Sequence, residues 1–249
     1  MKSITKILSL FLALTLLLSF PVAASAAELA NVPTIDVSKT GSLTIYKYDL
    51  TNAEKDGVWD SSYVSTGVYD EAGVNNVLGG NASSTLGNGE TGYGYAIKGV
   101  EFSYLKVADI VQFSESENDS RTDSHVEVLY AIDKTKGADF LKALNLADGK
   151  NRYTNADALD STKYYYQSDV LIDALAAALE SNSTVVKNAL EAYISANGGT
   201  AMPLTDAYGK TKAENLNLGL YLVVETKVPE MVVSTTDPFL ISLPMTSVN

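Results

Sequence analysis

The stretch YLVVETKVPE, residues 221–230, predicts a largely apolar strand with a glutamate near its end. Its first residues are large, apolar or β-branched, a composition that favours a strand. Successive side chains on a strand point to opposite faces, so Tyr221, Val223 and Glu225 share one face and apolar residues fill the other. Both faces therefore look buried, and a carboxylate closes one of them. The stretch predicts a central strand and raises the question of what a glutamate does there.

The chain opens with the features of a secretory signal peptide. Lys2 and Lys6 precede the apolar run ILSLFLALTLLLSF, and small residues follow before the first acid. A basic start, an apolar core and a small-residue cleavage site are typical of a removable leader. The alternative, an N-terminal membrane anchor, is disfavoured because the run is short for a spanning helix. We predict that residues 1–26 are removed, with cleavage one residue later, after Ala27, as the alternative, and that the mature chain is exported without a membrane span.

Charge and composition exclude several classes of function. The chain has 18 Lys and Arg against 30 Asp and Glu, a formal net charge of −12, which becomes −14 when the leader removes two lysines and no acid. Such an acidic chain offers no basic surface to nucleic acid. It also contains no cysteine, which excludes disulfides, thiolate metal sites and cysteine catalysis. We predict no cofactor and no metal site, and any covalent crosslink must use other residues.

Strand signals flank a long connection in the first half of the chain and return at its end. Residues 51–94 are rich in Gly, Asn, Ser and Thr and poor in helical pattern, so we predict a long loop, with room for short strands at 59–68. A tight turn is predicted at 206–209. Strands are predicted within 41–50, 94–110, 125–132, 210–219, 220–224 and 238–249.

Residues 167–197 have a clear helical pattern. Alanine and leucine recur at helical spacing, Ser168 and Ser183 are candidate N-caps, and Gly198 follows the end. The predicted helices are 169–180 and 184–196, with a tight break at 181–183. Strand-rich flanks around a helical insertion predict one mostly β domain, a β-sandwich carrying the insertion, and not two domains.

Several pieces of the mature chain occur together in a distinctive order: GSLTIYKYDL after the leader, GVEFSYLKVADI, NGGTAMPLTDAYGKT after the helices, LGLYLVVETKVPE, and PFLISLPMT. In this order they resemble the N-terminal domain of Gram-positive, sortase-assembled pilins. YLVVETKVPE is similar to the E-box of these pilins, Tyr-x-Leu-x-Glu-Thr-x-x-Pro. The matching residues are Tyr221, Leu222, Glu225, Thr226 and Pro229. Leu222 stands one place before the apolar position of the pattern, which Val223 occupies. The last part also resembles the end of a collagen-adhesin B-type sandwich.

The resemblance implies an immunoglobulin-like fold and a structural role. The chain is expected to be the N-terminal region of a backbone pilin, with residues 27–249 forming the pilin domain. The resemblance implies neighbouring pilin subunits and a pilus-specific sortase as partners. It also implies a location in a cell-wall-attached pilus and a biological role in adhesion. It is not expected to be an enzyme, beyond a single-turnover reaction on itself.

That reaction, implied by the resemblance, is an isopeptide bond between a lysine on the first strand and an asparagine on the last, assisted by an acid. Lys47 is the expected donor, since it shares a face with the apolar Leu43 and Ile45, and Glu225 is the expected acid. Burial favours the neutral amine and the protonated carboxyl, which suits a nucleophile and a proton relay. Lys106 is a second, less supported donor. The simpler alternatives are a lysine that reaches water and a carboxylate bonded to backbone N–H groups.

The chain departs from the pilin pattern near its end. It has no motif like Val-Tyr-Pro-Lys and no LPxTG-type sorting signal. We therefore expect it to stop short of the pilin motif, with the acceptor asparagine beyond Asn249; Asn249 itself is the alternative acceptor. The alternative function is a surface adhesin or minor pilin that binds a host ligand or glycan through loop 51–94.

Three further candidates have simpler explanations. His125, the only histidine, stands at a strand start, which argues against a hydrolase triad. The acids between 115 and 123 lack the glycine-bearing pattern of a calcium loop and read as a solvated turn. The tyrosines at 164–166 invite comparison with a carbohydrate platform, but packing is the more common use.

Overall fold

The computed structural model describes residues 35–57, 84–85, 91–92, 95–114, 126–230 and 235–244. The chain divides into two compact units. One unit, Val37–Phe113 and Val128–Asn249, carries nearly all of the described helices and strands. In the other unit, which includes Ser114–Glu127, the described residues are the ends of two strands and the two residues before Val37.

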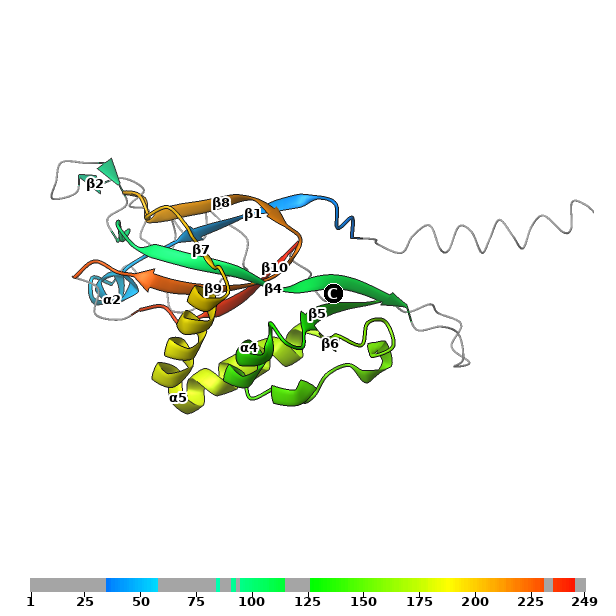
Figure 1. The fold of residues 1–249 in the computed structure, drawn as a ribbon. Helices are drawn as coiled ribbons and strands as arrows, with labels where there is room; N and C mark the ends of the chain where they lie inside the picture. Colours follow the sequence, from blue (N-terminus) through cyan, green and yellow to red (C-terminus); the bar gives the residue numbers. More distant parts are fainter. Residues whose placement is uncertain are drawn as a thin grey trace, which may run out of the picture. The chain divides into compact units, whose positions relative to one another are not determined.

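Strands account for most of the described elements, as predicted (Figure 1). The strands are β1 (Thr40–Tyr46), β2 (Ser84–Thr85), β3 (Thr91–Gly92), β4 (Glu101–Ser114), β5 (Val126–Asp133), β6 (Lys163–Tyr166), β7 (Thr200–Ala201), β8 (Lys210–Asn217), β9 (Gly219–Lys227) and β10 (Phe239–Leu243). The helices are α2 (Leu50–Lys55), α4 (Ala138–Ala143) and α5 (Ser168–Ala196), with short 3-10 turns at Ala147–Gly149 and Thr154–Ala156.

Two sheets enclose the main core. β1 and β8 form an antiparallel pair, and a larger sheet has the order β10-β9-β4-β5-β6 with β7 paired to β4. Buried residues from both sheets pack together: Leu43, Ala213 and Leu216 from the pair, and Phe102, Tyr221, Val223 and Leu243 from the larger sheet. The predicted β-sandwich with a helical insertion is confirmed.

β9 is the central strand that its sequence predicted. It pairs with β10 on one edge and β4 on the other, so its backbone groups are satisfied on both sides. Every residue from Gly219 to Glu225 is buried. Tyr221 and Val223 face the core shared with β1 and β8, while Leu222, on the opposite face, is also fully buried. Burial of both faces explains the continuous apolar run.

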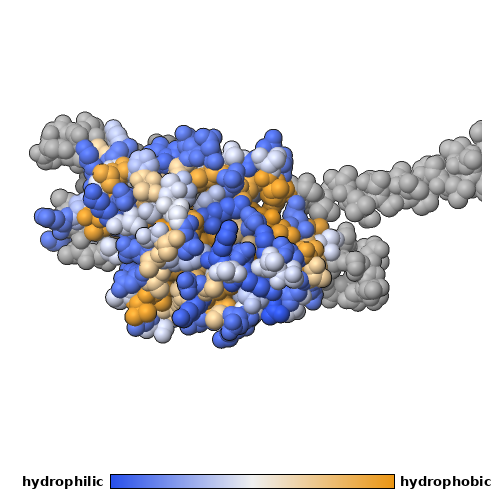
Figure 2. All heavy atoms as spheres, viewed as in Figure 1, coloured by the Kyte–Doolittle hydropathy of each residue, from blue (hydrophilic) through white to orange (hydrophobic). Residues whose placement is uncertain are grey.

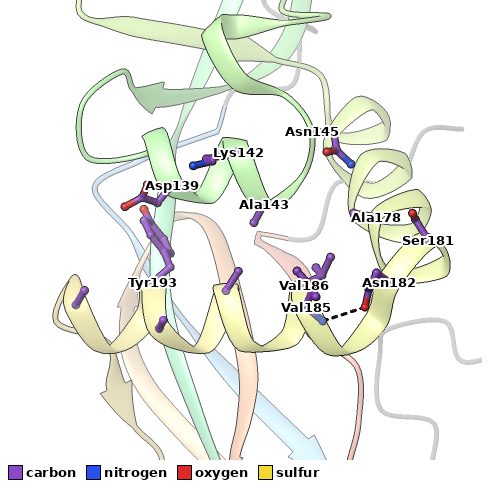
Figure 3. Close-up of a pocket in the computed structure, with 13 residues that line it drawn as sticks. Asp139, Lys142, Ala143, Asn145, Ala178, Ser181, Asn182, Val185, Val186 and Tyr193 are labelled. Carbon is purple, nitrogen blue, oxygen red and sulfur yellow. Dashed lines mark hydrogen bonds between the residues drawn. The ribbon is translucent and has the colours of Figure 1, made fainter.

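α5 contains the predicted break. Asn182 leaves the helical region, with φ −159° and ψ 79°, so α5 consists of two helical halves. The Oδ1 of Asn182 accepts the N–H of Val185 at 3.2 Å, the bond of an N-cap (Figure 3). The prediction of two helices is confirmed, but Ser183 is not the cap. Ser168 is not one either, because the first half begins at Ser168 and Gln167 precedes it without a side-chain cap bond.

The end of α5 follows from a glycine. Asn197 closes the helix, and Gly198 adopts φ +76°, which costs a residue without Cβ little. The N–H of Gly199 then bonds to the carbonyl oxygen of Ile194 at 2.9 Å, and this Schellman arrangement satisfies a terminal carbonyl. Gly198 therefore ends the helix where the sequence predicted.

The first half of the chain differs from the prediction in one described place. α2 lies at the start of the segment expected to be a loop, capped by the Asp49 carboxylate, which accepts the N–H of Asn52 at 3.0 Å. The possible strands at 59–68 and the acidic turn after Ser114 lie outside the described residues. β2 and β3 form a two-residue ladder inside the predicted loop.

Hydrophilic side chains predominate on the face of the molecule in Figure 2, with apolar residues in smaller groups between them. The large exposed apolar residues are spread along the described part of the chain, and the two on α5, Ile172 and Val185, lie on opposite sides of its break at Asn182; scattered residues of this kind are normal for a protein surface. They are Val37, Leu50, Leu159, Ile172, Val185, Leu204 and Tyr208. Within the described part of the chain, none of the helices combines the length and apolarity that crossing a bilayer needs.

Candidate functional site around Lys47 and Glu225

Lys47 directly follows β1, and its backbone is held on both sides. Its N–H donates to the carbonyl oxygen of Gly209 at 2.8 Å, and its own carbonyl oxygen accepts from Ile97 at 3.0 Å. Gly209 belongs to the predicted turn at 206–209, where the Asp206 carboxylate accepts the N–H of Lys210 at 3.0 Å. Gly209 has φ +69°, and a Cβ there would lie 2.4 Å from the carbonyl oxygen of Lys47. A glycine is therefore needed for the close approach that fixes Lys47.

Glu225 lies near the end of β9, opposite Phe102 of β4. Its side chain is completely buried. The next residue, Thr226, has its hydroxyl 3.1 Å from the hydroxyl of Ser103 and donates to the Glu101 carboxylate at 3.1 Å. The Thr226 side chain thus bonds to residues of β4. The Glu225 carboxylate bonds to other residues.

The structure brings Lys47 and Glu225 together. The Nζ of Lys47 lies 2.8 Å from the Oε2 of Glu225, and 13% of the lysine side chain is exposed. Thr236 completes the group: its hydroxyl accepts a hydrogen bond from Lys47 Nζ, and its backbone N–H donates to Glu225 Oε2 at 2.9 Å. The strand faces that the sequence predicted for Lys47 and Glu225 account for the meeting of these two side chains.

One carboxylate oxygen of Glu225 has no hydrogen-bond partner in this group. Glu225 Oε1 is buried and has no hydrogen-bond partner among the described residues. Leaving a buried acceptor unsatisfied costs about 1–3 kcal/mol, and more when the group is charged, so such atoms are rare and call for an explanation. Oε2 accepts two donors while Oε1 accepts none from the described part of the chain. The carboxylate is therefore half satisfied at the point where it meets the lysine.

A cleft of about 660 Å³ opens beside the pair. Lys47 and Thr236 line it together with apolar side chains that include Ile45, Phe239 and Ile241. Ile45 comes from β1, and the other two come from β10, the end strand of its sheet. β1 and β10, which are not paired with each other, thus supply much of the lining, and the amine of Lys47 lies at the wall.

The remaining E-box residues have structural positions. The Tyr221 hydroxyl donates to the carbonyl oxygen of Asn217 at 2.6 Å, and burial raises the pKa of this tyrosine. Leu222 is fully buried on the opposite face of β9. Pro229 packs against Gly99, where a Cβ would lie 3.5 Å from its Cγ. Glu225 is the E-box residue that contacts the amine.

The second lysine candidate, Lys106, lies elsewhere. Its Nζ pairs with the Asp109 carboxylate at 2.8 Å, and Lys163 contacts the same carboxylate at 3.0 Å. Burial acts to raise the pKa of Asp109, but the hydrogen bonds from the two lysines outweigh it and hold the pKa below its usual value. Lys106 is therefore part of a surface ion-pair group.

The tyrosines at 164–166 are used in packing. Tyr165 and Tyr166 are buried, and burial raises the pKa of Tyr166 to about 12. Tyr164 lies under Lys134, whose Nζ is 4.6 Å from the ring centroid. His125, the acids between 115 and 123, and Asn249 lie outside the described residues. Within the described ranges, no group of three acidic or histidine side chains is placed to hold a metal ion.

A second hollow, of about 550 Å³, lies between α4 and the two halves of α5 (Figure 3). Small side chains such as Ala143, Ala178 and Val186 line much of it. Its charged residues, Asp139 and Lys142, stand on α4. The hollow lacks the arrangement of amine, carboxylate and unsatisfied oxygen found beside Lys47.

Thr236 was not predicted from the sequence. It lies in a stretch without periodic pattern, between the E-box and the last strand. Its importance comes from two contacts with residues far away in the sequence or on another strand, Lys47 and Glu225. A threonine in a polar stretch gives no local signal of such contacts.

Comparison with known proteins gives one family. The family model for the Gram-positive pilin subunit D1, N-terminal domain, matches residues 38–249. No curated protein sequence matches the chain. Among solved structures, the chain is similar to the full-length major pilin SpaD from Corynebacterium diphtheriae, with 17% identity and a TM-score of 0.33, over 85% of this chain and 29% of that one. It is also similar to the full-length RrgB pilus protein from Streptococcus pneumoniae, with 15% identity and a TM-score of 0.21, over 59% of this chain and 22% of that one. The chain thus spans less than a third of the length of these pilins.

Proposed function

Because the chain belongs to the family of Gram-positive pilin subunit D1 N-terminal domains, we propose that it forms the N-terminal region of a backbone subunit of a cell-surface pilus. Residues 1–26 are the leader in this proposal, and residues 27–249 form the pilin domain. Neighbouring pilin subunits and a pilus-specific sortase are its partners. The family match and the two-sheet fold with its buried lysine–glutamate pair support a structural role.

The observation that carries the chemical part of the proposal is the half-satisfied Glu225 carboxylate beside Lys47. In this proposal Lys47 is the nucleophile, Glu225 is the acid, and the side-chain amide of an asparagine enters the cleft. A new bond forms between Lys47 Nζ and the amide carbon, while the bond from that carbon to its NH₂ group breaks. Glu225 relays the proton lost by the amine to the leaving group, which departs as ammonia. The product is an isopeptide bond.

The energetics favour such a reaction at a buried site. Withdrawing an ion from water costs several kcal/mol even in real proteins, and the attraction within a buried pair often fails to offset this. The crosslink replaces the lysine ammonium by a neutral amide and leaves Glu225 protonated, so both buried charges disappear. The fold supplies proximity, which alone can contribute about 7–11 kcal/mol toward a barrier. In a chain without cysteine, the bond takes the place of a disulfide.

Mass spectrometry of the intact full-length protein tests the crosslink. We expect the wild-type protein to be lighter than its sequence by one ammonia, and Lys47→Ala and Glu225→Ala to have their full sequence masses. Lys106→Ala is the matched control, because that lysine pairs with Asp109 instead of Glu225, and it should still lose ammonia. A wild-type protein of full sequence mass would overturn the chemical proposal.

The alternative function is binding of a host ligand through loop 51–94. Most residues of that loop lie outside the described part of the chain, whereas the buried pair lies within it. The pair favours the shaft subunit, and adhesion is then a property of the assembled pilus.

A further inference from the structure

Thr236 touches both members of the pair, and we propose that it is a positioning residue for the Lys47 amine, held in place by α5. This inference rests on the proposed crosslink. Residues 235–237, which we call the strap, directly precede Pro238 and β10. One side of the strap contacts the reacting groups, and the other side contacts the second half of α5.

The contacts of Lys47 decide where its lone pair points. A neutral amine has two N–H groups and one lone pair. In the structure Nζ donates to Glu225 Oε2 and to the Thr236 hydroxyl. Both N–H groups are engaged and the side-chain carbon takes the third position on the tetrahedral nitrogen, so the lone pair has only the fourth direction left. Without the Thr236 hydroxyl, the amine would turn about its bond to the side chain.

The contacts of Glu225 complete the site. Oε2 accepts from Lys47 and from the Thr236 backbone N–H, so the carboxyl group is held by one of its oxygens. Oε1 remains unpartnered among the described residues and buried. An amide whose carbon lies in the path of the lone pair can bond through its NH₂ group to Oε1, which is the oxygen placed to deliver the proton. Thr236 therefore orients both the nucleophile and the acid.

α5 holds the other side of the strap. The Asp237 carboxylate lies 2.8 Å from Lys187 Nζ and accepts from the Ser183 hydroxyl at 3.2 Å. Ser183 directly follows the break at Asn182, so Asp237 lies at the N-terminal end of the second helical half, where the helix dipole favours an anion. Lys187 also reaches the carbonyl oxygen of Thr235 at 3.4 Å. The helical insertion thus fixes the strap that fixes the amine.

The ordinary alternative is that Thr236 is an exposed threonine with an incidental side-chain bond. Its backbone N–H would reach Glu225 whatever the side chain, so substitutions isolate the hydroxyl. Thr236→Val keeps the shape and removes the hydroxyl, and Thr236→Ser restores a hydroxyl. Thr200→Val is the matched control, because Thr200 is an exposed threonine of β7 and belongs neither to the strap nor to the pair.

The experiment follows crosslinking in the full chain after a short pulse of expression, with intact mass recorded at intervals. We expect Thr236→Val to lose ammonia about 10- to 100-fold more slowly than the wild type, as misplaced reacting groups do. Thr236→Ser should regain the wild-type rate, and Thr200→Val should keep it. Equal circular dichroism spectra for the four proteins show that folding is not the cause.

The outcomes separate the inference from the proposed function. If the wild type and Thr236→Val lose ammonia at the same rate, the crosslink stands and the role of Thr236 is overturned. A slow Thr236→Ser protein would also overturn it, because the hydroxyl would then not be what matters. If none of the proteins loses ammonia, the crosslink itself fails, and the inference fails with it.

Discussion

The Nζ of Lys47 and the carboxylate of Glu225 lie 2.8 Å apart although 178 positions separate them in the sequence. Glu225 is positioned by the alternation of β9, and Lys47, the first residue after β1, continues the alternation of Leu43 and Ile45. The meeting of the two faces between the sheets brings the amine and the acid together. Their proximity is thus a consequence of sheet packing, and the charge of each has to be considered with the other.

The first prediction concerns the buried charges. Lys47→Met leaves Glu225 buried without its cation, whereas the double variant Lys47→Met with Glu225→Leu removes both charges. Neither protein can crosslink, so the comparison isolates the charge. We expect the double variant to be more stable by roughly 1–4 kcal/mol in urea unfolding, because a lone buried charge costs more than an apolar replacement.

A control for this prediction is the exposed pair of Lys187 and Asp237, whose side chains are 26% and 58% exposed. Lys187→Met should change the unfolding free energy by only ~0–1 kcal/mol. A Lys47→Met protein at least as stable as the double variant would contradict the account of the pair.

The second prediction concerns the turn behind Lys47. Gly209→Ala introduces a Cβ 2.4 Å from the Lys47 carbonyl oxygen, at a residue with φ +69°. Gly57→Ala imposes a similar backbone strain, since φ is +71°, but meets nothing within 4 Å. Strain of this kind costs about 1–3 kcal/mol, so Gly209→Ala should lose that amount plus the cost of the clash. Equal losses in thermal unfolding would mean that the contact with Lys47 is easily relieved.

The third prediction concerns the strap. Asp237→Asn weakens its attachment to Lys187 and Ser183, so the Thr236 N–H should leave Glu225 more often. Hydrogen exchange at the Thr236 amide should become faster, while amides of β9 stay unchanged. High salt should speed the same exchange in the wild type, because it screens the exposed pair. Unchanged protection in both conditions would show that α5 does not hold the strap.

The fourth prediction concerns the break in α5. Asn182→Ala removes the carboxamide oxygen that caps the second half and should cost about 0.5–2 kcal/mol of unfolding free energy, measured by urea unfolding. Ser181→Ala, next to it on the surface, should cost little. A larger loss for Ser181→Ala would mean that Asn182 is not the residue that caps the helix.

The fifth prediction concerns acid. The pKa of Asp109 is lowered from an ordinary 3.8, since hydrogen bonds from Lys106 and Lys163 outweigh burial. A lowered folded pKa gives stability that is fully present above the unfolded value and is lost as pH falls through the folded value. The difference in unfolding free energy between wild type and Asp109→Asn should therefore be constant near neutral pH and shrink in acid. A difference that is flat down to low pH would contradict this.

The part of the site that the sequence could predict depended on strand alternation. Tyr221, Val223 and Glu225 share a face because of a period that is visible in ten residues, and Lys47 continues the same period one residue beyond the end of β1. The break in α5 was predictable too, because three polar residues interrupt a run of Ala and Leu. Which of them caps the helix was not, since Ser183 and Asn182 are both good caps and the backbone at Asn182 decides.

The rest depended on contacts between distant segments. α2 and α4 are six residues each and β6 is four, too short for a period to stand out. Thr236 matters because of Lys47 and Glu225, and nothing in its neighbours indicates either. Tertiary contacts of single polar residues leave no pattern in the sequence.

The positions of the three groups in the chain decide which molecules can form the proposed bond. Lys47 follows β1, Glu225 lies on β9, and Thr236 lies between β9 and β10, so they meet only when almost the whole domain has assembled. A bond that requires all three would form in correctly folded molecules and not in misfolded ones. The bond is covalent and does not break when the domain opens briefly. A molecule that has folded correctly once would therefore keep the crosslink afterwards. Molecules without the bond would unfold more often and be cleaved by proteases, so the proposed crosslink would favour the survival of correctly folded molecules.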